Sequence, residues 1–107
     1  MKNQDRKIQE IQILEQNLQN LLLQKQAFQM ELSETQSALK EIENSGDEIF
    51  KIVGQLMIKT DKPKIKQELS DKEKILELRI KAIEKQETSF MEQLDSMREE
   101  IMKSAKK

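Results

Sequence analysis

The chain has 107 residues, of which 36% are charged and 3% aromatic, so it is one domain by length but lacks the large side chains that fill a globular core. Its formal net charge of −1, without a basic stripe or stacking aromatic residues, argues against nucleic-acid binding. The absence of Cys and His excludes disulfides, metal sites built on thiolate or imidazole, and catalysis by either side chain.

Residues 1–10 are too polar for a signal peptide, and no apolar run approaches the roughly 20 residues of a membrane span. We therefore expect a cytoplasmic protein without a membrane partner.

A first helix is predicted over residues 5–44, because mostly apolar residues recur there at alternating intervals of three and four. This first stripe consists of Ile11, Leu14, Leu18, Leu21, Lys25, Phe28, Leu32, Thr35, Leu39 and Ile42. Its 3.5-residue period indicates a coiled coil.

The first helix is predicted to stop at Asn44-Ser45-Gly46-Asp47. The polar side chains compete for backbone hydrogen bonds, and we expect Gly46 to adopt the left-handed conformation after the last turn. A β-hairpin is predicted over residues 48–60, because two β-prone runs flank Gly54-Gln55. A two-residue loop that begins with Gly indicates a type II′ turn.

A second helix is predicted over residues 62–104, with Asp61 as its N-cap and Pro63 in its first turn. Its stripe consists of Leu69, Glu73, Leu76, Ile80, Ile83, Glu87, Phe90, Leu94, Met97 and Ile101. Two stripes of similar length joined by a short connection are expected to pair in antiparallel orientation. The predicted fold class is therefore mainly α: a long antiparallel two-helix coiled coil joined by a single β-hairpin.

Lys25 and Glu87 are the clear charged exceptions within the two stripes. A charged residue at such a position commonly fixes the register of a coiled coil. We expect Lys25 to extend toward Glu77 or Glu84 on the facing helix, with its aliphatic stem still packed in the interface.

The hairpin carries apolar residues on both faces, and a two-stranded hairpin alone is marginally stable. If residue 53 lies opposite residue 56, one face carries Ile49, Val53, Leu56 and Ile58, and the other carries Phe50, Ile52 and Met57. Unpaired apolar strand edges also favour pairing with another strand. We therefore predict an oligomer that assembles through these seven residues, in a shared sheet or barrel.

The hairpin also resembles the linker of β-type prefoldin subunits, in which an aromatic-Lys pair precedes a Gly turn and an aliphatic-Lys strand. Here these features are Phe50-Lys51, Gly54 and Ile58-Lys59, although Gln55 stands where that family usually has Asn. Residues 76–81 and 84–87 are similar to the archaeal version of the family. A single hairpin distinguishes the chain from α-type subunits, which carry two.

The resemblance implies one prefoldin-like domain over residues 1–107, in a hexamer of two α-type and four β-type subunits with a double β-barrel platform. It implies an ATP-independent holdase without a cofactor, which captures unfolded proteins with its coiled-coil tips and delivers them to a group II chaperonin. The alternative is a structural scaffold or tethering coiled coil with one dedicated partner.

The predicted substrate-binding tip combines apolar residues from near both chain ends. They are Ile8, Ile11, Ile13, Leu14, Met91, Leu94, Met97, Ile101 and Met102. Ile11, Leu14, Leu94, Met97 and Ile101 also belong to the helix–helix interface, whereas the other four fall outside it. Flexible methionine suits a surface that must fit many partners.

Charge is also uneven along the chain: the side chains of residues 1–7 and 103–107 together carry a net charge of about +5, and those of the remaining residues about −6. Lys103, Lys106 and Lys107 are candidate contacts to an acidic patch of a chaperonin; alternatively, they complement the helix dipole and keep a frayed end in solution. Carboxylate pairs such as Glu84 and Glu87 do not suggest an enzyme, because an exposed coiled coil offers no cleft that would exclude water from them.

Overall fold

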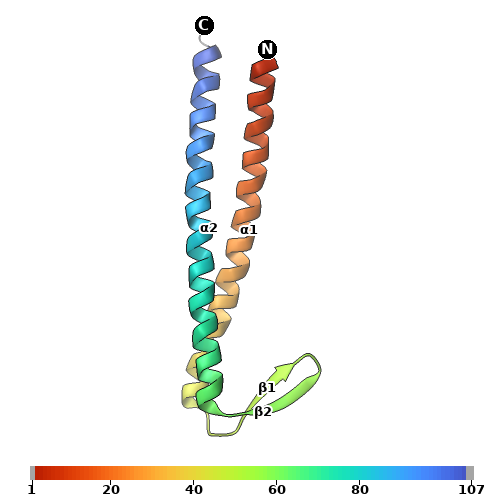
Figure 1. Cartoon of the computed structure of the whole chain (residues 1–107), viewed down its shortest axis with the longest axis vertical. Coiled ribbons are helices and arrows are strands. Elements are labelled where there is room, and N and C mark those ends of the chain that lie inside the picture. The colour runs from red at the N-terminus through yellow and green to blue at the C-terminus, as the bar shows by residue number, and fades with distance from the viewer. Residues whose placement is uncertain (1, 106–107) are drawn as a thin grey trace. The chain divides into compact units, whose positions relative to one another are not determined.

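The computed structural model describes residues 2–105 and shows two long helices joined by a two-stranded antiparallel hairpin, so the predicted fold class is confirmed (Figure 1). Helix α1 spans Lys2–Asn44, strand β1 Ile49–Val53, strand β2 Leu56–Thr60 and helix α2 Lys62–Ala105. No helix among the described residues is long and apolar enough to cross a membrane. Every residue of both predicted stripes is buried or half-buried, as the 3.5-residue period requires.

The chain divides into two compact units. The terminal unit comprises residues 2–27 and 80–105, and the hairpin unit comprises residues 28–79. In the terminal unit the helices are antiparallel, because Lys7 pairs with Glu100 while Lys25 pairs with Glu84. Its buried apolar residues are Leu14, Leu21, Ile80, Ile83 and Leu94. Burial of each such side chain contributes about 1.5–3 kcal/mol, which offsets the entropy lost on ordering the helices.

In the hairpin unit, Leu76 is the most buried apolar residue, with 2% of its surface exposed, and Ile65 is 8% exposed. The predicted second stripe began at Leu69, so it missed Ile65, which extends the same spacing by one step toward the hairpin. Thr35 is only 4% exposed, and its Oγ1 donates a 2.8 Å hydrogen bond to the Glu31 carbonyl oxygen. A satisfied hydroxyl explains how a polar residue is tolerated in the stripe.

The hairpin has the predicted register, with Val53 opposite Leu56 and Ile49 opposite Thr60. Gly54 has a φ of 61°, and no other described residue has a positive φ. A positive φ at the first central position alone defines a type II′ turn, so that prediction is confirmed. Nothing lies within 4 Å of a Cβ placed on Gly54. Glycine is therefore required there by backbone conformation and not by space.

The end of α1 differs from the prediction, because Gly46 does not adopt the left-handed conformation. Ser45 closes the helix instead: its backbone N–H and its Oγ donate to the Ile42 carbonyl oxygen, at 3.2 and 2.8 Å. The Lys62 ammonium donates to the carbonyl oxygens of Glu43 and Ser45, at 3.5 and 3.2 Å. These donors satisfy carbonyls that a left-handed glycine would otherwise serve.

The start of α2 is as predicted. The backbone N–H of Lys64 donates to Oδ1 of Asp61 at 2.9 Å, which is the N-cap hydrogen bond. Pro63 lies in the first turn, where its missing N–H leaves no hydrogen bond unmade. The end of α1 is therefore closed by Ser45 and Lys62, and the start of α2 is capped by Asp61.

Candidate functional site

The nine residues of the predicted substrate-binding tip all lie in the terminal unit. As expected, the five that belong to the helix–helix interface are less exposed than the other four. Leu14 and Leu94 are buried, and Ile11, Met97 and Ile101 are half-buried in the helix–helix interface. The other four are exposed: Ile8 by 45%, Ile13 by 61%, Met91 by 54% and Met102 by 61%. These four, referred to below as the exposed tip residues, are the apolar side chains of the predicted set that are most open to a ligand.

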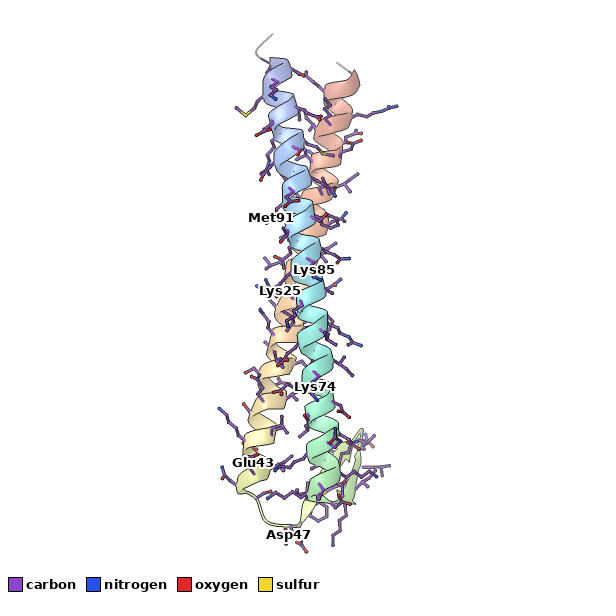
Figure 2. All side chains as sticks on the ribbon, turned by 60° about the vertical axis from the view of Figure 1, so that its left-hand side comes forward. Lys25, Glu43, Asp47, Lys74, Lys85 and Met91 are labelled. Atoms are coloured by element: carbon purple, nitrogen blue, oxygen red, sulfur yellow. The ribbon has the colours of Figure 1, made fainter. Side chains whose placement is uncertain are left out.

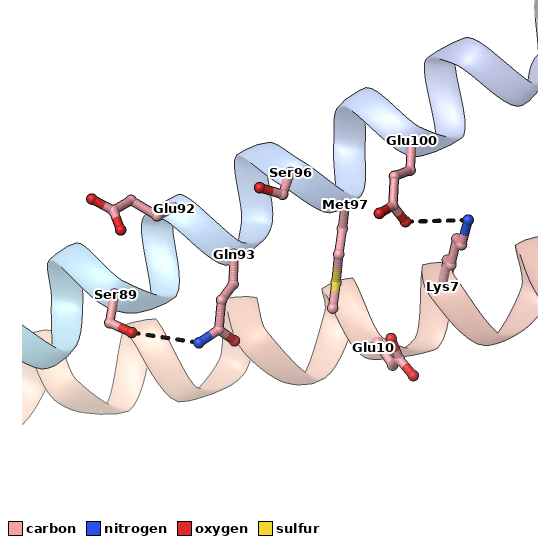
Figure 3. Close-up of a pocket in the computed structure, with 8 residues that line it drawn as sticks. All are labelled: Lys7, Glu10, Ser89, Glu92, Gln93, Ser96, Met97 and Glu100. Carbon is pink, nitrogen blue, oxygen red and sulfur yellow. Dashed lines mark hydrogen bonds and ion pairs between the residues drawn. The ribbon is translucent and has the colours of Figure 1, made fainter.

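Two hollows lie along the helices of the terminal unit. The first, of about 380 Å³, is lined by Met97 and by polar side chains from both helices, among them Glu10 of α1 (Figure 3). Two interactions order its walls: Lys7 pairs with Glu100 at 3.2 Å, and Gln93 Nε2 donates to Ser89 Oγ at 3.4 Å (Figure 3).

The second hollow of the terminal unit, of about 230 Å³, is lined by Met91, Leu18, Leu94 and Asp95 together with Glu15 and Arg98. Arg98 donates to Glu15 at 2.9 Å across the two helices. Met91, labelled in Figure 2, thus contributes to both the exposed surface and a hollow. Both hollows place a methionine beside carboxylates.

The hairpin strands expose nearly all their apolar side chains. Ile49 is half-buried, and the six others are 47–71% exposed: Phe50, Ile52, Val53, Leu56, Met57 and Ile58. The register places these residues on both faces of the hairpin, as the sequence predicted. One ion pair, between Lys51 and Glu68 at 2.8 Å, links β1 to α2. A surface this apolar is typical of an interface rather than of a monomer.

Lys25, labelled in Figure 2, lies within ion-pair distance of two carboxylates in the terminal unit. Its ammonium is 3.6 Å from Glu84, one of the two predicted alternatives, and 3.3 Å from Glu87, which was not predicted as a partner. The side chains of Lys25 and Glu87 are each 19% exposed. Glu87 Oε1 is buried without a hydrogen bond, so its contact with Lys25 has ion-pair distance but not hydrogen-bond geometry. Lys25 and Glu87 therefore compensate each other's charge.

Five further exposed apolar side chains were not singled out from the sequence. They are Leu22, Leu23, Met30, Ile75 and Leu78, which are 46–67% exposed. Each lies outside the two stripes, and that position is the signal that would have identified them. They provide comparison residues for any test of the exposed tip residues.

Charged side chains form no metal site in the part of the chain that the structure describes, because no group of three or more carboxylates is suitably placed. Of the three predicted chaperonin contacts, Lys103 is exposed in the last turn of α2. Lys106 and Lys107 lie outside the described residues.

Comparison with known proteins gives consistent matches over most of the chain. The family described as prefoldin subunit matches residues 5–107. The chain is 42% identical to the prefoldin subunit beta of Pyrobaculum aerophilum over 84% of its length and 73% of that protein. It is 44% identical to that of Thermococcus onnurineus over 81% of its length and 77% of that protein. The crystal structure of the prefoldin beta subunit from Thermococcus strain KS-1 superposes with a TM-score of 0.87 at 36% identity, covering 95% of this chain and 91% of that one.

Proposed function

The chain belongs to the prefoldin subunit family of chaperones, and from this membership we propose that it holds unfolded proteins without ATP, as a β-type subunit with one domain over residues 1–107. The observation that carries the proposal is the set of exposed tip residues, Ile8, Ile13, Met91 and Met102. Isoleucine and methionine side chains at half exposure offer apolar contact without fixed geometry, which suits clients of many sequences. No cofactor and no enzymatic step is needed for such binding.

Assembly belongs to the same proposal. The seven apolar hairpin residues are the oligomerisation surface, because their exposed faces and strand edges are stabilised by pairing with hairpins of other subunits. The partners are other prefoldin subunits, in a hexamer of two α-type and four β-type chains with a shared barrel platform. Several copies of the terminal unit then bind one client together, and linkage raises the avidity of individually weak contacts.

The captured client is then delivered to a group II chaperonin, and the site of action is the cytoplasm. Lys103, with Lys106 and Lys107, contributes positive charge for docking on an acidic surface of the chaperonin.

The exposed tip residues provide the test of client capture. Changing Ile8, Ile13, Met91 and Met102 together to Ser is expected to abolish most of the delay that the assembled protein imposes on aggregation of a chemically denatured test protein, measured by light scattering. Helicity and oligomeric mass are expected to be unchanged, because side chains that are already half exposed contribute little to folding.

The matched control changes Leu22, Leu23, Met30 and Leu78 to Ser, which removes an equal number of similarly exposed apolar side chains elsewhere. This control is expected to keep full protection. Equal loss in both variants would mean that general apolarity, and not the exposed tip residues, holds the client. Failure of the unmodified protein to protect several unrelated clients would favour the alternative, a scaffold with one dedicated partner.

A further inference from the structure

The two hollows of the terminal unit share a composition that the proposed function does not explain. The first places Met97 between Gln93 and the Lys7–Glu100 pair, with Glu10 and Glu92 also lining it (Figure 3). The second places Met91 beside Asp95 and the Glu15–Arg98 pair. Each hollow therefore offers an aliphatic contact together with carboxylates.

The cations of these hollows are already engaged. Lys7 is 3.2 Å from Glu100, and Arg98 is 2.9 Å from Glu15. Among residues 2–105, in contrast, Glu10, Glu92 and Asp95 form no ion pair with a basic side chain. Both hollows consequently carry net negative charge, which attracts a cation from outside the chain.

We propose that these hollows select client segments in which an aliphatic side chain is flanked by lysine or arginine. The aliphatic side chain contacts Met97 or Met91, and the flanking cation pairs with Glu10, Glu92 or Asp95. The Gln93 amide and the Ser89 hydroxyl lie on the same wall and can hydrogen-bond the extended backbone of the client. This inference rests on the proposed holdase function and adds to it a preference in charge.

The test compares two fluorescent synthetic peptides that share one leucine-containing extended segment. One peptide has lysines on both sides of the segment, and the other has glutamates at the same positions. Binding to the full chain in its assembled state is measured by fluorescence anisotropy. Because exposed ion pairs are individually weak, we expect a Kd roughly three- to tenfold lower for the lysine peptide, which corresponds to about 0.6–1.4 kcal/mol.

The carboxylates are tested with the triple change Glu10→Gln, Glu92→Gln and Asp95→Asn, which keeps side-chain size. It is expected to remove the difference between the two peptides. The matched control is Glu34→Gln, Glu77→Gln and Asp47→Asn, which neutralises three exposed carboxylates of the hairpin unit. This control should keep the difference, and about 1 M salt, where the Debye length is about 3 Å, should suppress it in the unmodified protein.

Equal affinity for both peptides, or a preference that survives the triple change, would overturn the charge selectivity and leave the holdase function standing. Absence of binding to either peptide would count against the holdase function itself, and the selectivity would fall with it. Loss of the preference in the triple variant alone is the result that supports the inference.

Discussion

At the scale of single residues, Lys25 and Glu87 form a charged contact within the mostly apolar stripes. Their side chains are 19% exposed, so most of their hydration is lost, and Glu84 adds a second carboxylate at 3.6 Å. Changing Lys25 to Met leaves Glu87 partly buried without its cation. We expect this change to lower the free energy of unfolding by about 1–2 kcal/mol, less than for a fully buried pair because water still reaches the site. The measurement is urea unfolding followed by circular dichroism.

The double change Lys25→Met and Glu87→Met is expected to recover most of that loss, because it replaces an ion pair by apolar contact. Lys85→Met is the control, since Lys85 is exposed on α2. If Lys25→Met and Lys85→Met have equal effects, the pair contributes no stability, and its role is limited to register.

At the scale of elements, the hairpin exposes apolar side chains on both of its faces. Ile52 and Ile58 lie on opposite faces and are 71% and 47% exposed. Changing both to Asp would bury charge in either face of an assembled sheet, which is costly without a partner. We expect a helical species of lower mass, measured by circular dichroism and light scattering after size-exclusion chromatography.

The control variant, Gln55→Asp with Lys59→Asp, places aspartates at polar positions of the same hairpin and should leave the mass unchanged. An unaltered mass for the Ile52 and Ile58 variant would assign assembly to the helices.

Much of this element structure was predictable because periodicity records burial directly. The 3.5-residue stripes located the interface residues, and Gly54-Gln55 fixed both the register of the hairpin and its turn type. The departures depend on contacts between distant residues. Lys62 reaches the carbonyls at the end of α1, so Gly46 need not become left-handed. Likewise, the contact of Lys25 with Glu87, in addition to the predicted Glu84, depends on how the two helices face each other, which a repeating pattern does not specify residue by residue.

The candidate site was predictable only in part, for a related physical reason. Exposure of the tip residues Ile8, Ile13, Met91 and Met102 follows from their position outside the stripes. Leu22, Leu23 and Met30 have the same property, so exposure alone does not single out a binding surface. The net charge of the hollows was not predictable, because it depends on which lining side chains pair with each other across the two helices, as Lys7 does with Glu100.

At the scale of the whole molecule, the residues proposed for assembly and those proposed for capture lie in different compact units, since the hairpin belongs to one unit and the exposed tip residues to the other. Each surface can therefore be altered without the other. The proposed chaperonin contact is a third, separate set of residues, of which Lys103 lies in the last turn of α2. Charge at an interface rim acts mainly on the rate of association and on its dependence on salt.

We therefore expect the triple change Lys103→Glu, Lys106→Glu and Lys107→Glu to slow binding to a group II chaperonin and to flatten the ionic-strength dependence of the association rate, measured by surface plasmon resonance. Capture of an unfolded client is expected to persist, because apolar contact carries it. The control is Lys40→Glu, Lys74→Glu and Lys85→Glu, which makes the same change in net charge at exposed positions along the helices. Slower binding in both variants would indicate a general effect of net charge. An unchanged rate in the first would leave the terminal lysines with the simpler role of complementing the dipole at the C-terminal end of α2.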